Sequence, residues 1–415
     1  MSPQAEKPTI ILATSNGVGM GHLARASAIA LELKEIANPI IVSMAGGVAE
    51  VPNFVGVRCE YIPGRDRGWM PRKLWDAYLR DRLLALIEET DAQVLSFDGV
   101  VPYPGVIGAK LRKNDLALVW VRRGLWQKKP QGLALGLQSM MMDAIIEPGD
   151  FARVYDHGPT KNRKDAVVTS AVSLYQESTA LDRDESRIAL GIDLNRPAVL
   201  VQLGTGDSDV NEKMTAALKG LIGWKDLQVI LTKKPIDANG NSLVPDGLEI
   251  KQVRYFPLAK VLHAFDAAIC ATGYNGVHEL LPALVPTVFV SNIRGTDDQE
   301  ARAQWCHDMG FALRGNQADL GDITATVKKL QDPDVRARLS KKCGELSDPT
   351  GGAEIAKILY ELAVREEPIR PSWLRYNQLR IQEHINRGLR HVAYMGLRRL
   401  ALVYRFINPH IVVQV

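Results

Sequence analysis

The feature that most constrains the fold is an apolar run that leads directly into a glycine turn and a helical segment. Residues 267–271 form a short apolar run of the kind buried in parallel sheets. Gly273 and Gly276 follow, and they allow the backbone to turn sharply and approach a ligand, with the amides of the next helix pointing outward. Glu279 stands one helical turn later, where a carboxylate can accept hydrogen bonds from two ribose hydroxyls. The pattern predicts a turn that binds phosphate, followed by a carboxylate that binds ribose.

A second strand and an acidic loop come next in the chain. The run 286–292 has the apolar character of a strand, and Asp298 and Gln299 stand just before another helical segment. An acid and an amide beside a phosphate cradle can hold sugar hydroxyls, as a nucleotide-sugar donor requires. Arg294 and Asp297 are secondary candidates from the same loop.

Residues 267–312 resemble the donor-binding half of the GT-B glycosyltransferases, especially the MurG-type enzymes that add N-acetylglucosamine to a lipid-linked acceptor. The resemblance implies two Rossmann-like, doubly wound parallel-sheet domains that face a central cleft. It also implies that the turn holds the diphosphate, that Glu279 holds the ribose, and that Asp298 and Gln299 hold the sugar. The four residues of the turn are Gly273, Tyr274, Asn275 and Gly276.

The segment departs from the family pattern in two places. Tyr274 stands where the family has a small residue, and the bulky pair Val277 and His278 precedes the glutamate. These departures concern the preference for base and sugar more than the fold.

The length and the alternation of strand and helix patterns predict an α/β protein of two domains. We place an N-terminal acceptor-binding domain at 1–178, a C-terminal nucleotide-sugar-binding domain at 179–366 and a helical tail at 367–415. Ligands of open α/β sheets bind at the carboxyl ends of the strands, so the glycine turns of both domains should line one crevice.

The start of the chain is polar, and no apolar run reaches about 18 residues, so we expect neither a secretory signal nor a spanning helix. Four scattered cysteines without metal-ligand spacing are typical of buried thiols in a reducing compartment. We therefore expect a cytoplasmic protein.

A glycine loop that ends at His22 follows the first strand, Thr9–Thr14. A dinucleotide-binding loop would have a third glycine at this position and an acid after the second strand, and the chain has neither. A loop that ends in Gly-His at a helix start resembles instead the first loop of GT-B enzymes. The resemblance implies that Gly19 and Gly21 face the acceptor and that His22 is the base.

Imidazole suits this role because inverting glycosyl transfer requires a group that takes the proton of the acceptor hydroxyl. Its unperturbed pKa of about 6.5 is well matched to neutral pH. Alternatively, His22 only caps its helix or hydrogen-bonds the loop. Asp98 stands just past a strand end, and four roles are open to it. It could orient His22, act as the base itself or bind the acceptor, or it could only cap its own turn.

Three further groups of residues stand at strand ends. Arg122 and Arg123 are adjacent, so only one should face a given side, where it binds an anionic acceptor or the diphosphate; pairing with a local acid is the alternative. Gly204, Thr205 and Gly206 should approach the diphosphate or the sugar. The resemblance alone implies that the backbone near Phe256 contacts the base.

Two D-x-D matches, at 182–184 and 207–209, superficially fit the metal motif of the other major glycosyltransferase fold. Such short matches arise easily by chance, and GT-B enzymes usually neutralise the leaving diphosphate with helix dipoles and hydrogen-bond donors. We expect no essential metal and no cofactor beyond the nucleotide diphosphate sugar as co-substrate.

The basic character of the chain lies in its tail. Residues 369–415 carry eight Arg and one Glu, whereas the whole chain has a net charge of +4. Apolar and aromatic residues alternate with arginines over 370–407, a pattern that suits a helix on an anionic membrane surface. The alternative is a helix that packs across both domains or on a partner subunit. No nucleic-acid motif accompanies the arginines, so no nucleic acid partner is expected.

Together these patterns and the resemblance to GT-B enzymes imply a metal-independent, inverting hexosyltransferase. It would move a sugar from a nucleotide diphosphate sugar, most simply a UDP-sugar, to a hydroxyl of a cell-envelope glycan or lipid-linked acceptor. Such an enzyme could lie peripherally on the inner face of the plasma membrane. The alternatives are a nucleotide-sugar 2-epimerase, which shares this fold, and a non-catalytic donor-binding or membrane-docking subunit.

Overall fold

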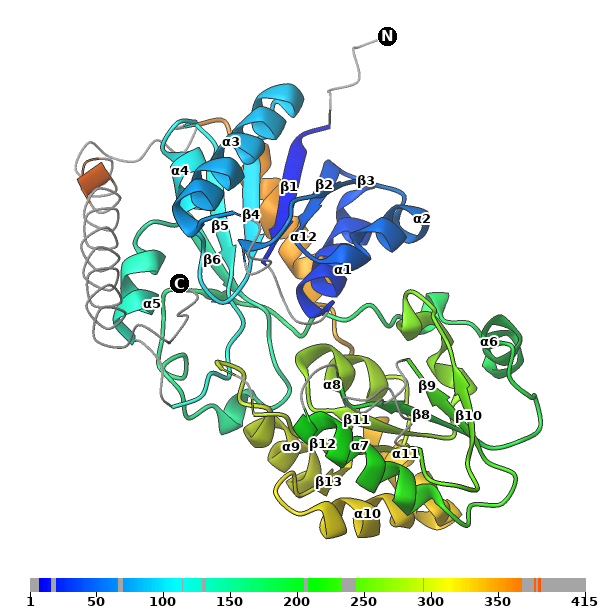
Figure 1. The fold of residues 1–415 in the computed structure, drawn as a ribbon. Helices are drawn as coiled ribbons and strands as arrows, with labels where there is room; N and C mark the ends of the chain where they lie inside the picture. The colour runs from blue at the N-terminus through cyan, green and yellow to red at the C-terminus, as the bar shows by residue number, and fades with distance from the viewer. Residues whose placement is uncertain are drawn as a thin grey trace, which may run out of the picture.

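The computed structural model describes residues 7–15, 20–65, 70–113, 115–128, 132–204, 208–232, 244–293 and 295–367, together with 377, 380 and 381. Two α/β domains, each built on a parallel sheet, lie one above the other in Figure 1. The fold class predicted from the sequence, two doubly wound domains, is confirmed.

The first domain contains a seven-stranded sheet in the order β3-β2-β1-β4-β5-β6-β7, with every neighbouring pair parallel. Its strands are β1 (Thr9–Thr14), β2 (Asn38–Ser43), β3 (Arg58–Tyr61), β4 (Val94–Asp98), β5 (Ala117–Val121), β6 (Ala144–Glu147) and β7 (Val167–Val168). Its helices are α1 (Gly21–Leu33), α2 (Val51–Val55), α3 (Arg72–Thr90), α4 (Pro104–Lys110) and α5 (Gly132–Ser139).

The second domain repeats this order with six parallel strands, β10-β9-β8-β11-β12-β13. The strands are β8 (Ala198–Gln202), β9 (Gln228–Leu231), β10 (Glu249–Gln252), β11 (Ala267–Ala271), β12 (Thr287–Val290) and β13 (Leu313–Gly315). The helices are α6 (Arg183–Leu190), α7 (Ser208–Leu221), α8 (Tyr274–Leu280), α9 (Gln299–Asp308), α10 (Leu320–Lys328) and α11 (Pro333–Cys343).

Burial on both faces explains why the central strands are continuous apolar runs. All six residues of β1 are buried, and they alternate between two cores: Ile10 and Leu12 pack on one face, and Ile11 and Ala13 on the other. The core that contains Ile10 continues into the second domain, so a single cluster of buried apolar side chains runs through both domains. The two sheets are therefore joined by packing as well as by the chain.

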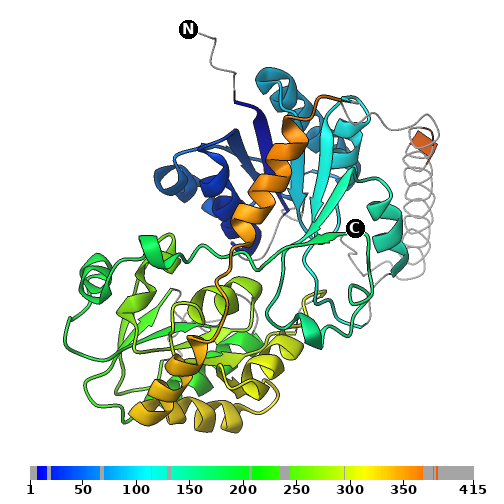
Figure 2. The ribbon, with the colours of Figure 1, turned by 180° about the vertical axis from the view of Figure 1, so that it is seen from behind.

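The last described helix, α12 (Gly351–Ala363), crosses back to the first domain (Figure 2). It packs against α1, β1 and β4, and the Gly351 amide donates to the carbonyl of Ala171 (2.9 Å). The Glu354 carboxylate accepts from the Ser170 amide (3.0 Å). The boundary expected at residue 366 assigned this helix to the second domain, and in the structure it covers the first. None of the described helices is long and apolar enough to cross a membrane.

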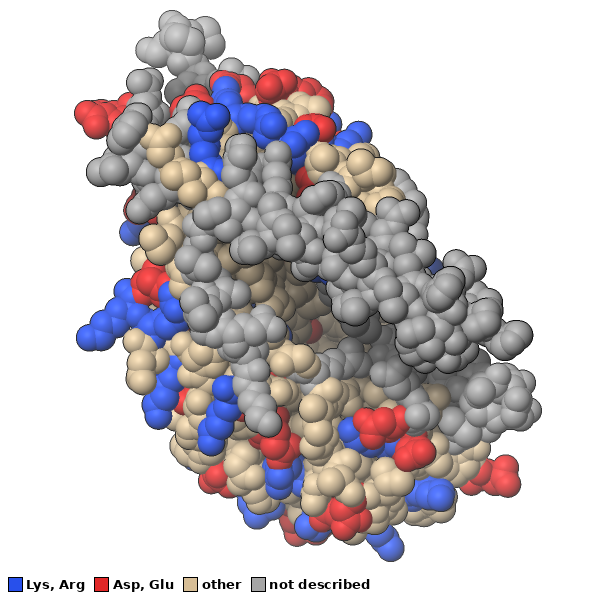
Figure 3. All heavy atoms as spheres, turned by 60° about the vertical axis from the view of Figure 1, so that its left-hand side comes forward, with Lys and Arg blue, Asp and Glu red and all other residues tan. Residues whose placement is uncertain are grey.

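The strand order reverses direction between β1 and β4 in the first sheet, and between β8 and β11 in the second. Chain segments that leave these four strands therefore meet at the place where open α/β sheets bind ligands. Figure 3 shows basic and acidic side chains interspersed over the second domain.

Candidate active site

A cluster of the half-buried His22 with the buried Asp98 and Arg25 forms the first-domain wall of the site. The glycine loop after β1 leads into α1, which carries His22 in its first turn, and Asp98 ends β4 beside it. The Nδ1 atom of His22 lies 2.7 Å from Asp98 Oδ1. One turn along α1, Arg25 donates to the same carboxylate from Nε (2.9 Å) and Nη2 (2.7 Å), and Nη2 lies 2.8 Å from His22 Nδ1.

The charges of this cluster fix its protonation at neutral pH. Burial alone would raise the pKa of Asp98, but Arg25 and His22 outweigh burial and lower that pKa to about 2. Burial lowers the pKa of His22, against the opposing effect of Asp98, so the imidazole is neutral. An ionised Asp98 that accepts the Nδ1 proton leaves Nε2 with a free lone pair, the arrangement of a histidine base oriented by a carboxylate.

The second-domain wall begins at the glycine turn after β11. A side chain at Gly276 would place Cβ 2.9 Å from Cys270 Sγ and 3.3 Å from the Ala271 carbonyl, so α8 packs against β11 at a distance that only glycine allows. A Cβ at Gly273 would meet nothing within 4 Å, so the backbone there faces open space. The first-turn amides of α8 have no intrahelical acceptor, as in every α-helix, and can receive an anion.

Glu279 is the least satisfied charged group at this wall. Its side chain is half-buried, and its carboxyl group makes no hydrogen bond or ion pair within the described part of the chain. Burial raises the pKa of Glu279 to about 8. A perturbed carboxyl group without a partner, close to the glycine turn, is a candidate ligand-binding group.

The two departures from the family pattern lie at the domain interface. The hydroxyl of Tyr274 donates to the Gly149 carbonyl (2.7 Å) and accepts from the Val172 amide (2.9 Å), both in the first domain. His278, one turn later on the same face of α8, accepts from the Phe151 amide through Nε2 (3.2 Å). Its Nδ1 donates to the Tyr274 carbonyl (2.6 Å). Both bulky side chains therefore serve contact between domains.

The two walls also touch each other directly. The Arg25 guanidinium lies over the Tyr274 ring, 5.0 Å from its centroid. Asn275 Nδ2 donates to the Gly21 carbonyl at 3.4 Å. The histidine cluster and the glycine turn, which are far apart in the sequence, are thus brought together.

The predicted sugar pair has partners within its own domain. The Asp298 carboxylate caps α9 by accepting from the Ala301 amide (3.0 Å). The Gln299 side chain is buried, and its Oε1 accepts from the Asn292 amide (2.9 Å). Contact of either residue with a sugar stays a prediction.

The two adjacent arginines have different partners. Arg122 is fully buried, stacks over the Trp120 ring (5.3 Å) and donates from Nη2 to Asp165 (2.9 Å), so the alternative of a local ion pair describes it. Arg123 Nη1 lies 3.4 Å from Asp297 Oδ2 in the other domain. Both guanidinium groups therefore contact acids of the protein itself.

Other expected residues are only partly covered by the structure. Gly204, at the end of β8, is exposed and has a positive φ of 96°, which favours glycine. Phe256 packs edge-on against Phe54 of the first domain, with ring centroids 5.9 Å apart. The following lie outside the described residues: Gly19, Thr205, Gly206, Arg294, Asp207 of one D-x-D match, and the tail at 370–407 except 377, 380 and 381.

Three residues at the site were not identified from the sequence: Arg25, Asp150 and Arg302. Arg25 could have been found, because its spacing of three residues from His22 places both on one face of a helix. Asp150 and Arg302 form an ion pair between residues distant in sequence, Arg302 Nε donating to Asp150 Oδ2 (3.0 Å), and no local pattern reveals such a pair.

No protein-family model matches the chain. Among curated relatives, a transferase of Cutibacterium acnes is 22% identical over 378 residues, which cover 86% of this chain and 98% of the relative. It is named UDP-N-acetylglucosamine–N-acetylmuramyl-(pentapeptide) pyrophosphoryl-undecaprenol N-acetylglucosamine transferase. The resemblance to MurG-type glycosyltransferases and the enzyme class, both predicted from the motifs, are therefore confirmed.

Solved structures show the same fold. Acinetobacter baumannii MurG superimposes with a TM-score of 0.53 at 17% identity, over 85% of this chain and 99% of that one. A UDP-N-acetylglucosamine 2-epimerase, described as putative, from Listeria monocytogenes has a TM-score of 0.58 at 13% identity, over 89% and 99% of the two chains. At such low identity the likeness establishes the fold and does not separate the two activities. The chain thus has the GT-B fold, and its sequence resembles the MurG-type glycosyltransferases over most of its length.

Proposed function

We propose that this protein is an inverting glycosyltransferase that moves a sugar from a UDP-sugar to a hydroxyl of a lipid-linked precursor of the cell envelope. One observation carries the proposal: a neutral, carboxylate-oriented histidine lies against the glycine turn of a chain that resembles MurG-type transferases over most of its length. The relatives' printed substrates supply the donor and acceptor classes.

The first-domain wall would provide the base. As the acceptor oxygen attacks the anomeric carbon, His22 Nε2 takes the hydroxyl proton while the bond from that carbon to the diphosphate oxygen breaks. Asp98 stabilises the imidazolium that forms, and Arg25 holds Asp98 ionised and in place. With both oxygens engaged and a pKa of about 2, Asp98 is suited to orient His22 rather than to accept the proton itself.

The second-domain wall would hold the donor. The amides at the start of α8 point towards the open space at Gly273 and would receive the leaving diphosphate, whose charge the helix dipole stabilises. Glu279 would accept from the ribose hydroxyls, and Asp298 and Gln299 would contact the sugar. Independence from metal is part of the proposal, and full transfer activity in excess EDTA is its expected result.

The first test identifies the donor. A bound ligand raises the melting temperature by mass action, so a panel of nucleotide sugars should single out a UDP-sugar. Transfer of that sugar to a lipid-linked acceptor, with inversion at the anomeric carbon seen by NMR, is the expected product. Acceptor-independent epimerisation of the donor would instead establish the isomerase, and absence of turnover with every acceptor would establish a binding subunit.

The second test addresses the donor site. Glu279→Ala should weaken UDP-sugar binding about 100-fold, because two hydrogen bonds to a charged acceptor are lost. Isothermal titration measures the change, and circular dichroism checks the fold. Glu249→Ala is the control, since Glu249 is an exposed residue of the same domain that pairs with Arg196. Wild-type affinity in Glu279→Ala would contradict the assignment.

We further propose that the 370–407 tail binds an anionic membrane surface on the cytoplasmic side and brings the site to its lipid-linked acceptor. The charge of the tail and its interleaved apolar residues support this proposal. Sedimentation with vesicles rich in acidic phospholipid, compared with neutral vesicles, tests it. Removal of residues 370–415 should abolish co-sedimentation while leaving UDP-sugar binding intact.

A further inference from the structure

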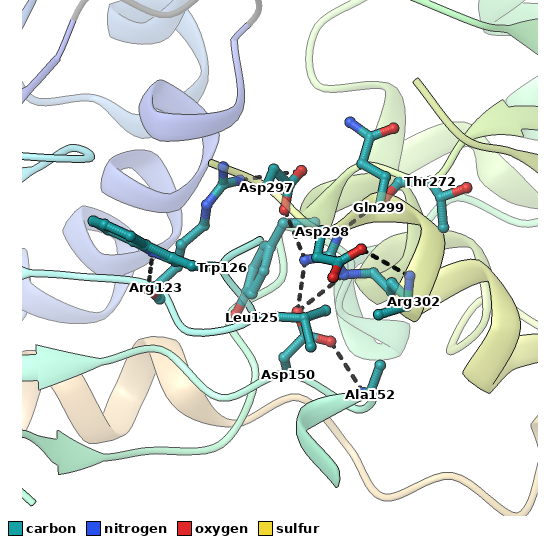
Figure 4. A network of polar contacts seen from close by, with 12 residues as sticks. Arg123, Leu125, Trp126, Asp150, Ala152, Thr272, Asp297, Asp298, Gln299 and Arg302 are labelled. Atoms are coloured by element: carbon teal, nitrogen blue, oxygen red, sulfur yellow. Dashed lines mark hydrogen bonds and ion pairs between the residues drawn. The ribbon is translucent and has the colours of Figure 1, made fainter. Parts of the chain in front are cut away.

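Arg302 joins three segments that meet at the domain interface. The residue lies in the first turn of α9, and its side chain is fully buried. Nη1 donates to the Thr272 carbonyl (2.8 Å), Nη2 to Asp297 Oδ1 (3.0 Å) and Nε to Asp150 Oδ2 (3.0 Å), as Figure 4 shows. Thr272 directly precedes the glycine turn, Asp297 directly precedes the predicted sugar pair, and Asp150 belongs to the first domain.

The backbone of the acidic loop is held by the first domain as well. Trp126 and Asp297 form an antiparallel bridge. The Asp298 amide donates to the Leu125 carbonyl (3.0 Å), and the Gln127 amide donates to the Thr296 carbonyl (3.0 Å). The position of Asp298 therefore depends on a loop of the other domain.

The charges of the buried network favour one relative position of the two domains. Asp297 is flanked by Arg302 of its own domain and Arg123 of the other. Burial would raise the pKa of Asp297, but the two arginines lower it to about 2. A buried carboxylate that loses one of these partners is left uncompensated, so the network favours one relative position of the domains.

We propose that Arg302 is a positioning residue that makes recognition of the donor sugar depend on closure of the two domains. This inference rests on the proposed function. The Arg302 guanidinium couples Asp150 to the two donor segments, so displacement of the first domain also displaces the residues next to Gly273 and Asp298. A lysine keeps the charge but lacks the planar fork that reaches three separate acceptors.

The inference separates the two halves of the donor. The nucleotide is expected at Gly273 and Glu279, on the second domain alone, whereas the sugar requires the acidic loop that the first domain holds. Loosening the network should therefore weaken the binding of UDP-N-acetylglucosamine more than the binding of UDP.

Two variants loosen the network from opposite sides. Asp150→Asn removes the charge on the first domain, and Arg302→Lys removes the fork on the second. Two ion pairs within single domains, each with a buried basic side chain, provide controls: Arg187→Lys, where Arg187 donates to Asp266 (2.9 Å), and Asp143→Asn, where Asp143 lies 3.0 Å from Lys110 Nζ. The controls cost stability in a similar way but do not join the domains.

The experiment titrates each full-length protein with UDP and with UDP-N-acetylglucosamine by calorimetry, and follows turnover with a lipid-linked acceptor. In Asp150→Asn and Arg302→Lys, UDP affinity should change less than threefold, UDP-N-acetylglucosamine affinity should fall about tenfold, and kcat/KM should fall about 100-fold. Small-angle scattering should show a larger radius of gyration for these two variants than for the wild type and the controls.

Three results would overturn the inference. The two variants could retain the wild-type ratio of UDP-N-acetylglucosamine affinity to UDP affinity. Alternatively, both control variants could change this ratio as much as Asp150→Asn and Arg302→Lys do. The wild type could also bind neither ligand, in which case the proposed function fails too, and this shared failure is recognised before any variant is made. If Arg302→Lys does not fold, Asp150→Asn decides the matter, because it changes no volume and leaves Arg302 paired with Asp297.

Discussion

The two walls of the site satisfy their polar groups in opposite ways. On the first-domain wall, His22 and Arg25 both hydrogen-bond to Asp98 within one domain, and both carboxylate oxygens of Asp98 are engaged. On the second-domain wall, Glu279 has no partner among the described residues, and Tyr274 relies on acceptors and donors of the other domain. One wall is complete in itself, whereas the other requires the ligand and the opposite domain to complete it.

This difference follows from the tasks that the two walls would perform. A base must hold one tautomer in one orientation before the substrate arrives, and fixed hydrogen bonds achieve this. A donor-binding group must remain open, and the cost of leaving it half-buried and unpaired is offset only when the ligand binds. Changes at the first wall should therefore affect the rate of reaction, and changes at the second wall should affect affinity.

The largest effect is expected for His22→Ala, which removes the base from the complete wall. We expect kcat to fall about 1,000-fold with little change in the donor Kd, because general-base catalysis typically contributes 10²–10⁴-fold. Initial rates at saturating donor and acceptor measure kcat. His307→Ala provides the control, since His307 is an exposed residue of α9. If His22→Ala kept full kcat, the first wall would not control the reaction rate, and the proposed difference between the two walls would be contradicted.

The next effect concerns the interface that supports the second wall. Burial lowers the pKa of His278 to about 4, and the neutral ring accepts a hydrogen bond from the Phe151 amide, which a protonated ring could not do. An unfolded chain binds this proton at about pH 6.5, so stability falls as the pH drops from about 6.5 to 4. The His278 contribution to the free energy of unfolding should decrease by about 3 kcal/mol over this range.

Urea denaturation at a series of pH values measures this loss. His278→Gln keeps a side chain that donates and accepts hydrogen bonds but does not titrate. Between pH 6.5 and 4, its free energy of unfolding should therefore fall by about 3 kcal/mol less than that of the wild type. Equal slopes for the two proteins would mean that the interface does not hold His278 neutral.

The sequence predicted the wall built from local patterns better than the wall built from contacts between domains. The ends of β1 and β4 brought His22 and Asp98 together, as expected when parallel strands share a carboxyl edge. Strands β1 and β11 begin and end at the predicted residues, because they are apolar runs buried on both faces. Strand β3 was missed because its half-exposed residues, RCEY, show no apolar alternation.

Contacts between the domains could not be predicted because they depend on how two independently patterned units face each other. Tyr274 and His278 were recognised only as departures from a family pattern, and their partners lie more than a hundred residues away. The return of α12 to the first domain has the same origin, since its apolar face does not specify which of two sheets it covers.

The smallest effect concerns the unpaired carboxyl group itself and tests the comparison most directly. With a pKa of about 8, the free Glu279 is mostly protonated at pH 7, whereas ribose hydroxyls are best accepted by the ionised form. Binding must then release a proton, so the affinity for UDP-N-acetylglucosamine should increase up to about tenfold between pH 7 and 8.5. Calorimetry in buffers of different ionisation enthalpy measures both the affinity and the released proton.

The control is Glu279→Gln, which should bind weakly with no such pH dependence, because the amide does not ionise. Asp98, with its pKa of about 2, cannot contribute in this range. A proton release that survives in Glu279→Gln would therefore place the titrating group elsewhere and remove the contrast between the two walls.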